Sequence, residues 1–167
     1  MSTTAVPPQP SPRARGFCMP PEWARHTGTW LTWPHCTDTW PGMDLAESVE
    51  PAYVAMVKAL AEGETVHVNV LSDDHAAAVA SRLHAGGVPD EAPVVLHRIP
   101  TDDEWIRDYG AVILTNRAGE RLATDWIFNA WGGKYDRTEQ NNRVPEAMAA
   151  LLDAERVVCP AVMEGGS

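Results

Sequence analysis

The sequence has little positive charge, few cysteines and no long apolar run. Its 167 residues carry 13 lysines and arginines against 23 aspartates and glutamates, and the resulting formal net charge of −10 excludes the basic footprint of a nucleic-acid-binding protein. No apolar stretch reaches the roughly 18 residues that a membrane-spanning helix needs. We therefore expect no nucleic acid and no membrane among its partners.

The three cysteines, Cys18, Cys36 and Cys159, are an odd number without CxxC spacing. They predict neither a disulfide framework nor a zinc site, and they fit a reducing cytoplasm, where we expect the protein to reside. Residues 1–16 are rich in proline, serine and threonine and lack the apolar core of a secretory signal. We interpret them as a disordered leader to one domain over residues 17–167.

Beyond the leader, short apolar segments alternate between the period of a strand and that of a helix, which predicts an α/β domain. Strands are expected at residues 27–33, 65–71, 94–99, 111–115, 121–128 and 157–162. Helices are expected at residues 51–63, 72–86 and 144–152. The acidic segment 101–108 is expected to be a loop, and the recurring strands and helices indicate a repeated βαβ-like module.

Residues 102–110, DDEWIRDYG, bring four carboxylates, a tryptophan and an arginine to the end of a strand, where sites are commonly built. A carboxylate matches two parallel N–H donors of a guanidinium, and an adjacent indole adds a cation–π surface. Asp108 and Trp105 supply these two parts. The alternative is that the acids are solvated and that Arg107 pairs with one of them.

Seven tryptophans are more than one modest core needs, so several are expected to line a pocket. Trp131 lies in the sequence FNAWGGKY, where paired glycines allow the backbone to approach a ligand closely, and a packed aromatic cluster is the alternative. His26, His35, Cys36 and Asp38 do not have the spacing of metal ligands. We therefore expect no metal.

Four groups of residues occur in order along the chain: MPPEW with TWLTWP at 19–34, WIRDYG at 105–110, DWIFNAWGGKY at 125–135, and EGGS at 164–167. Together they closely resemble the agmatine deiminase family, which is similar to the Porphyromonas-type peptidyl-arginine deiminases. The resemblance runs from about Met19 to the last residue.

The resemblance implies a pentein fold, a pseudo-fivefold propeller of ββαβ modules around an acidic pocket, of which this chain is the incomplete N-terminal half. It implies hydrolysis of the small cationic guanidine agmatine to N-carbamoylputrescine and ammonia, a step of putrescine biosynthesis, without metal or organic cofactor. By this resemblance Asp108 binds the guanidinium and Trp105 forms a wall beside it. Glu164 is the acid that contacts the catalytic histidine, and Trp131 is counted with the substrate-binding residues.

In a family member the catalytic histidine, a second guanidinium-binding aspartate and the nucleophilic cysteine would follow residue 167. None of the three cysteines present stands in the nucleophile's motif. Because losing a nucleophile removes several orders of magnitude of rate, we expect residues 1–167 to be inactive alone. A peptidyl-arginine deiminase of the same fold and a non-catalytic, cation-binding half-propeller stay open as alternatives, as does a homo-oligomer.

Overall fold

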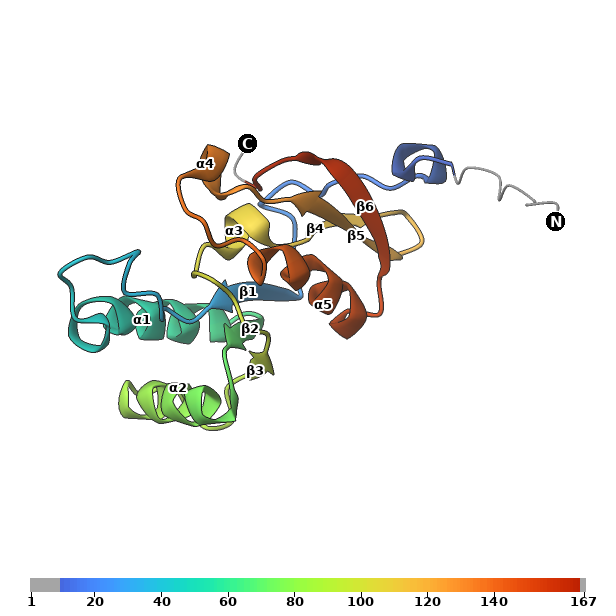
Figure 1. Cartoon of the computed structure of the whole chain (residues 1–167). Coiled ribbons are helices and arrows are strands. Elements are labelled where there is room, and N and C mark those ends of the chain that lie inside the picture. The colour runs from blue at the N-terminus through green and yellow to red at the C-terminus, as the bar shows by residue number, and fades with distance from the viewer. Residues whose placement is uncertain (1–9, 166–167) are drawn as a thin grey trace.

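The computed structural model describes residues 10–165, which form two three-stranded sheets flanked by helices (Figure 1). The first sheet consists of β1 (Gly28–Thr32), β2 (Thr65–Val70) and β3 (Val94–Arg98), parallel and hydrogen-bonded in that order. Parallel neighbours need crossover connections, and α1 (Glu50–Ala61) and α2 (Asp73–Ala85) provide them. A π-helical turn, η2 (Leu45–Val49), leads directly into α1.

The second sheet is one ββαβ unit. Its strands β4 (Val112–Thr115) and β5 (Arg121–Ile127) form an antiparallel hairpin, and β6 (Glu155–Val162) lies parallel to β5 after the crossover helix α5 (Val144–Leu151). Four short helical turns complete the chain: η1 (Pro12–Arg15), α3 (Ile106–Tyr109), α4 (Ala130–Gly133) and η3 (Asn141–Arg143). The unit has the same order of strands and helix, ββαβ, as the propeller module that the family resemblance implies.

Local side-chain contacts explain where several elements begin and turn. The Ser72 hydroxyl accepts the backbone N–H of His75 at 3.2 Å and so caps the first turn of α2. In the β4–β5 hairpin, the side-chain oxygen of Asn116 accepts the N–H groups of Ala118 and Glu120, each at 3.0 Å. Gly119 takes the left-handed conformation of this turn, with φ of 80°.

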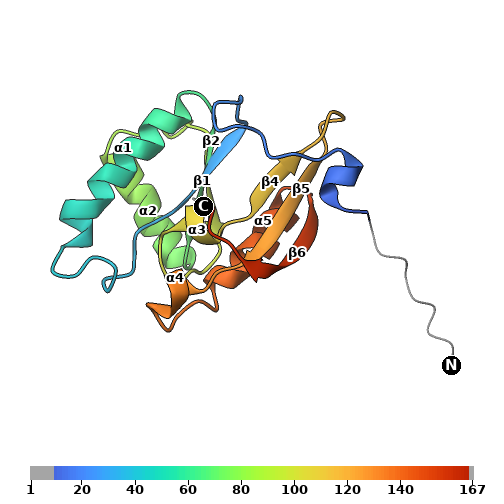
Figure 2. The same cartoon turned by 90° about the horizontal axis from the view of Figure 1, so that it is seen from above.

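Two apolar cores cover opposite faces of the first sheet. The first core lies between this sheet and α1 and α2, and its most buried side chains include Val57, Val66, Val68 and Val79. In the second core, Trp30 of β1 packs against a set of buried side chains from later in the chain, among them Tyr109, Phe128, Val144 and Met148. Figure 2 accordingly shows α1 and α2 on one side of β1 and β2, and the second sheet on the other. Coverage of both faces is typical of a parallel sheet.

The predicted α/β class is confirmed, and all six expected strands and three expected long helices are present with small shifts of their boundaries. The prediction of a loop over residues 101–108 was wrong at its end, because α3 begins at Ile106. The last strand begins at Glu155, earlier than expected. None of the helices within residues 10–165 has the length and apolarity needed to cross a membrane.

The expected leader is only partly within the described residues. Its residues 1–9 lie outside them, as do residues 166–167 of the final motif. Pro12–Arg15 forms the turn η1, which Ser11 caps, and the Arg15 guanidinium donates to both carboxylate oxygens of Glu155 in β6. The division between a leader and a domain at residue 17 stays a prediction.

Candidate functional site

The predicted site lies on a short turn that follows the carboxyl end of β3. Residues 99–105 lead from β3 into α3, whose single turn is closed by the N–H of Asp108 to the Trp105 carbonyl at 2.9 Å and by the N–H of Gly110 to the Ile106 carbonyl at 2.7 Å. A side chain at Gly110 would place its Cβ 2.6 Å from that same Ile106 carbonyl oxygen. The glycine therefore allows the tight turn that carries Trp105 and Asp108.

Asp108 and Glu164, far apart in the sequence, lie close together in the structure. Burial raises the pKa of the Asp108 carboxyl above its ordinary value, the negative charge of Glu164 raises it further, and the Arg107 guanidinium partly offsets both. The backbone at Gly165 explains the proximity, because a Cβ there would lie only 2.1 Å from the Arg107 carbonyl oxygen. The segment after β6 thus lies directly on the α3 turn. Figure 1 and Figure 2 both show the C-terminal end of the ribbon next to α3.

The alternative interpretation of this segment paired Arg107 with one of its own acids. In the structure the Arg107 guanidinium instead donates to the Glu22 carboxylate at 2.8 Å, and both side chains are exposed. Asp108 is half-buried rather than solvated. Its raised pKa is the opposite of what a close pairing with Arg107 would produce.

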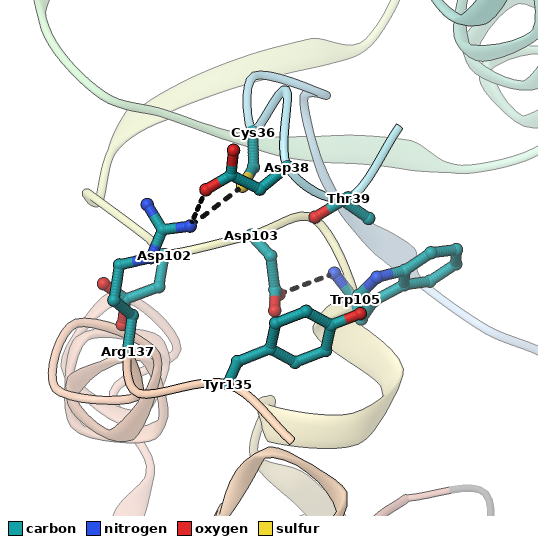
Figure 3. Close-up of a pocket in the computed structure, with 8 residues that line it drawn as sticks. All are labelled: Cys36, Asp38, Thr39, Asp102, Asp103, Trp105, Tyr135 and Arg137. Carbon is teal, nitrogen blue, oxygen red and sulfur yellow. Dashed lines mark hydrogen bonds and ion pairs between the residues drawn. The ribbon is translucent and has the colours of Figure 1, made fainter. Parts of the chain in front are cut away.

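Trp105 presents a partly exposed indole at the start of the turn that carries Asp108. Its side chain is 38% exposed, and its ring lies against Trp40 with a centroid distance of 5.7 Å and a tilt of 32°. The Trp105 backbone N–H donates to the Asp103 carboxylate at 3.1 Å, as Figure 3 shows. One side of the indole is therefore supported by protein while part of it stays accessible, as a wall beside a bound cation requires.

Two acids behind Trp105, Asp103 and Glu104, are buried. Burial raises the pKa of both carboxyls, and neighbouring groups that include His35 offset only part of this increase. The indole N–H of Trp40 also lowers the pKa of Glu104, although neither carboxylate oxygen has a hydrogen-bond partner of good geometry among the described residues. The segment just before Trp105 therefore buries two carboxyl groups.

His35 is a residue whose role the sequence did not reveal. Its Nδ1 lies 3.0 Å from the Trp33 carbonyl oxygen and its Nε2 lies 3.1 Å from the Thr101 carbonyl oxygen. Both carbonyl oxygens lie within hydrogen-bond distance of the ring, so His35 links residues 33 and 101 near the buried acids Asp103 and Glu104. It is not free to bind a metal, and no cluster of three metal-ligating side chains occurs within residues 10–165.

Trp105 also lines a small cavity of about 10 Å³, which has room for about one water (Figure 3). Its acids already have partners. Asp38 accepts from the Arg137 guanidinium, and Asp102 accepts the backbone N–H groups of Gln140 at 2.9 Å and Asn141 at 3.1 Å. Asp108 and Glu164 do not line this cavity. The carboxylates of Asp38 and Asp102 are therefore already hydrogen-bonded within the protein.

Trp131 lies in an aromatic cluster. Its ring packs edge-on against Phe128 with centroids 5.2 Å apart and against Tyr135 with centroids 5.9 Å apart. It lies in a strained turn, in which Ala130 and Trp131 itself both have φ of 53°. Its partly buried side chain is attached to the second core, so its predicted contact with substrate stays a prediction.

All three cysteines are unpaired thiols. Burial and the nearby carboxylate of Asp125 raise the pKa of the Cys159 thiol, which disfavours the thiolate. The Cys36 sulfur lies 3.9 Å from the Arg137 guanidinium in the small cavity, away from Asp108. Neither arrangement brings a thiolate to the Asp108–Glu164 pair.

Comparison with known proteins finds a matching family and similar proteins. The sequence model of the family described as "Porphyromonas-type peptidyl-arginine deiminase" matches residues 18–167. The chain is 38% identical over 161 residues to the "Putative agmatine deiminase" of Marinomonas sp. (strain MWYL1), covering 94% of this chain and 41% of that protein. It is 33% identical to the protein of the same name from Pectobacterium atrosepticum, covering 100% of this chain and 44% of that protein.

Among solved structures, the agmatine deiminase of Enterococcus faecalis superposes with a TM-score of 0.82 at 28% sequence identity, covering 93% of this chain and 41% of that one. The mixed α/β architecture is therefore part of the pentein fold, and it is incomplete. The chain spans about two fifths of the length of the curated relatives that it matches.

Proposed function

Since the chain belongs to the Porphyromonas-type peptidyl-arginine deiminase family, we propose that it carries the guanidinium-binding part of an agmatine deiminase. The overall reaction hydrolyses agmatine to N-carbamoylputrescine and ammonia, with water supplying the new oxygen. We assign it to putrescine biosynthesis in the cytoplasm. The names of the Marinomonas relative and of the Enterococcus faecalis enzyme support the substrate.

One observation carries the proposal: Asp108 is half-buried beside a second carboxylate, Glu164. Two like charges in a partly desolvated place raise the free energy of the folded chain unless a cation lies between or beside them. A guanidinium supplies that cation, and its two parallel N–H groups match the oxygens of one carboxylate. The accessible part of the Trp105 indole adds a cation–π surface.

In this proposal Asp108 accepts two N–H groups of the substrate, and Glu164 orients a catalytic histidine. That histidine and the cysteine nucleophile belong to the part of the family length that this chain does not span. The cysteine thiolate attacks the central guanidinium carbon, and the C–N bond breaks as the histidine protonates the departing ammonia. Water, deprotonated by the same histidine, then breaks the C–S bond of the thiouronium and restores the thiolate.

The division of roles predicts binding without turnover. Purified residues 1–167 should bind agmatine in a calorimetric titration and release no ammonia from it. A chimera that joins Ser167 to the portion of the Marinomonas relative beyond the matched region should release ammonia. Turnover by residues 1–167 alone would contradict the assigned location of the nucleophile, and absence of agmatine binding would contradict the assigned role of Asp108.

Asp108→Asn tests the proposed anchor directly. The amide keeps the size of the side chain but loses the charge, so agmatine binding should fall by at least about tenfold, because hydrogen bonds to charged groups contribute about 1.5–3 kcal/mol. Asp153→Asn is a matched control, since Asp153 is exposed and its φ of 47° suits asparagine. The control should bind agmatine as the wild type does. If both variants bind equally well, Asp108 is not the anchor.

The family description itself supports a second candidate substrate, a peptidyl-arginine. The chimera distinguishes the two by its kcat/KM for agmatine and for arginine within a blocked tripeptide. The alternative that is not an enzyme is a non-catalytic, cation-binding half-propeller. Size-exclusion chromatography addresses it, because a monomer that stays soluble favours an independent module, whereas tight self-association or aggregation favours a part of a larger ring.

A further inference from the structure

A chain of buried side-chain hydrogen bonds connects the first sheet to the turn that carries Trp105 and Asp108. The Tyr109 hydroxyl oxygen lies 2.8 Å from the Asp103 carbonyl oxygen and 2.9 Å from the Thr32 hydroxyl oxygen. The Thr32 hydroxyl in turn accepts the side-chain N–H of Asn69 at 3.2 Å. Asn69, Thr32 and Tyr109 are each 2% exposed or less.

The chemistry of these groups allows only one direction for the protons. The Asp103 carbonyl can only accept, so the single hydroxyl proton of Tyr109 points to it. Toward Thr32 the Tyr109 oxygen therefore acts as acceptor, and the Thr32 hydroxyl donates. The Thr32 oxygen then receives the Asn69 amide proton. Burial raises the pKa of Tyr109 well above its usual value, so the hydroxyl proton is retained.

One end of this row of hydrogen bonds lies in the first sheet, and the other end lies on the turn. Thr32, the last residue of the edge strand β1, is the register partner of Asn69 in the central strand β2, and this sheet is covered on both faces. Asp103 and Tyr109 flank the turn, and Asp103 also accepts the Trp105 backbone N–H through its carboxylate. The hydroxyl of Tyr109 therefore closes residues 103–109 into a loop that is fixed to the rigid sheet.

We propose that Tyr109 is a positioning residue, whose hydroxyl, supported by Thr32 and Asn69, fixes the 103–109 turn so that Trp105 and Asp108 are held ready for a guanidinium. The inference rests on the proposed function, but its geometric part does not depend on it. Tyr109 does not touch the substrate in this proposal. Its effect on binding comes from avoiding the ordering of the turn when the ligand arrives.

Four variants of residues 1–167 test the proposal. Tyr109→Phe and Thr32→Val each delete one hydroxyl of the chain, whereas Thr32→Ser retains it. Thr124→Val is the matched control, because Thr124 is also buried and its hydroxyl donates to the Val112 carbonyl at 3.0 Å, but in the second sheet. Thr32→Val and Thr124→Val should therefore cost similar global stability while differing in their effect on the turn.

The first measurement is amide hydrogen exchange of residues 105–110 under conditions where the whole chain stays folded. Tyr109→Phe and Thr32→Val should accelerate this exchange by about fivefold or more, the ratio expected when a buried hydrogen bond of about 1 kcal/mol is lost. Thr32→Ser and Thr124→Val should leave it at the wild-type rate. Equal exchange in Tyr109→Phe and wild type, or equal acceleration by Thr124→Val, would overturn the proposal.

The second measurement is the dissociation constant for agmatine. Tyr109→Phe should raise it by about fivefold, from the same lost hydrogen bond, and Thr32→Ser should restore what Thr32→Val loses. If the wild type binds no agmatine, the proposed function fails, and the exchange measurement still decides whether Tyr109 fixes the turn. If the wild type binds and Tyr109→Phe binds equally well, the positioning role is wrong while the proposed function stands.

Discussion

Gly165 is the position at which the least change should have the largest effect on the site. A Cβ there would lie 2.1 Å from the Arg107 carbonyl oxygen, which is a backbone atom of the α3 turn and has no rotamer by which to move away. Carbon–oxygen contacts in proteins begin at about 3.3 Å, so Gly165→Ala would force the two segments about 1.2 Å apart. The change would carry Glu164 away from Asp108.

The displacement should be visible in the ionisation of Asp108. With Glu164 further away, the pKa of the Asp108 carboxyl should fall, yet stay above its ordinary value, because burial is the larger cause of the increase. Carboxyl-carbon NMR across a pH titration of residues 1–167 measures this. A misplacement of about 1 Å near a reacting group can lower the rate by about a hundredfold. In the chimera, Gly165→Ala should therefore lower kcat/KM for agmatine by about this factor. Global stability should change little, because Gly165 lies after the last strand and outside both cores.

Gly63→Ala is the matched control for this prediction. Gly63 has open space around its Cβ position and lies after α1, remote from Asp108 in the sequence. It should leave both the pKa of Asp108 and the kcat/KM of the chimera unchanged. An unaltered Asp108 titration in folded Gly165→Ala would refute the reasoning, because Glu164 would then owe its position to something other than this backbone contact.

Three further predictions concern the rest of the chain. Burial raises the folded-state pKa of the Glu104 carboxyl, so ionisation of this group lowers the free energy of unfolding as pH rises above about 4 toward neutrality. Glu104→Gln should therefore raise the denaturant midpoint at pH 7 but not at pH 3. Burial lowers the pKa of His67 and His97, so their contribution is present above about pH 6.5 and lost as pH falls; His97→Gln should flatten the decline in melting temperature toward pH 5. Gly86→Ala should destabilise by about 1–3 kcal/mol in urea unfolding because its Cβ would lie 2.3 Å from a Val54 methyl carbon, and adding Val54→Ala should restore most of the loss.

Short-range patterns predicted the regular elements well. The strand expected at residues 65–71 and the helix expected at residues 72–86 depend on patterns within a few residues, and the structure has both within one residue of these bounds. The turn α3 was missed because its residues, Ile106–Tyr109, show no helical apolar period. Besides its own backbone hydrogen bonds, this turn has a contact between the Tyr109 hydroxyl and Thr32 of the distant strand β1, and no local pattern indicates such a contact.

The site was predictable in part for the same reason. A carboxylate and an indole on one acidic turn mark Asp108 and Trp105 by chemistry alone, whereas the closeness of Glu164 depended on a resemblance to a family and on a backbone contact through Gly165. The contacts of His35 come from two carbonyl groups that converge on it from residues 33 and 101. Long-range convergence of this kind is a property of the folded chain and leaves no mark in a single sequence.

The proton affinity of Asp108 separates the two interpretations of the acidic turn. A solvated aspartate paired with Arg107 would have a lowered pKa, and a bound cation could gain little by approaching it. A half-buried aspartate beside Glu164 has a raised pKa, and a guanidinium that binds it must displace part of the proton population. Binding of agmatine should therefore weaken as pH falls through the raised pKa of Asp108, and it should release protons in that range. A binding constant independent of pH across the Asp108 titration would mean that the cation is held elsewhere.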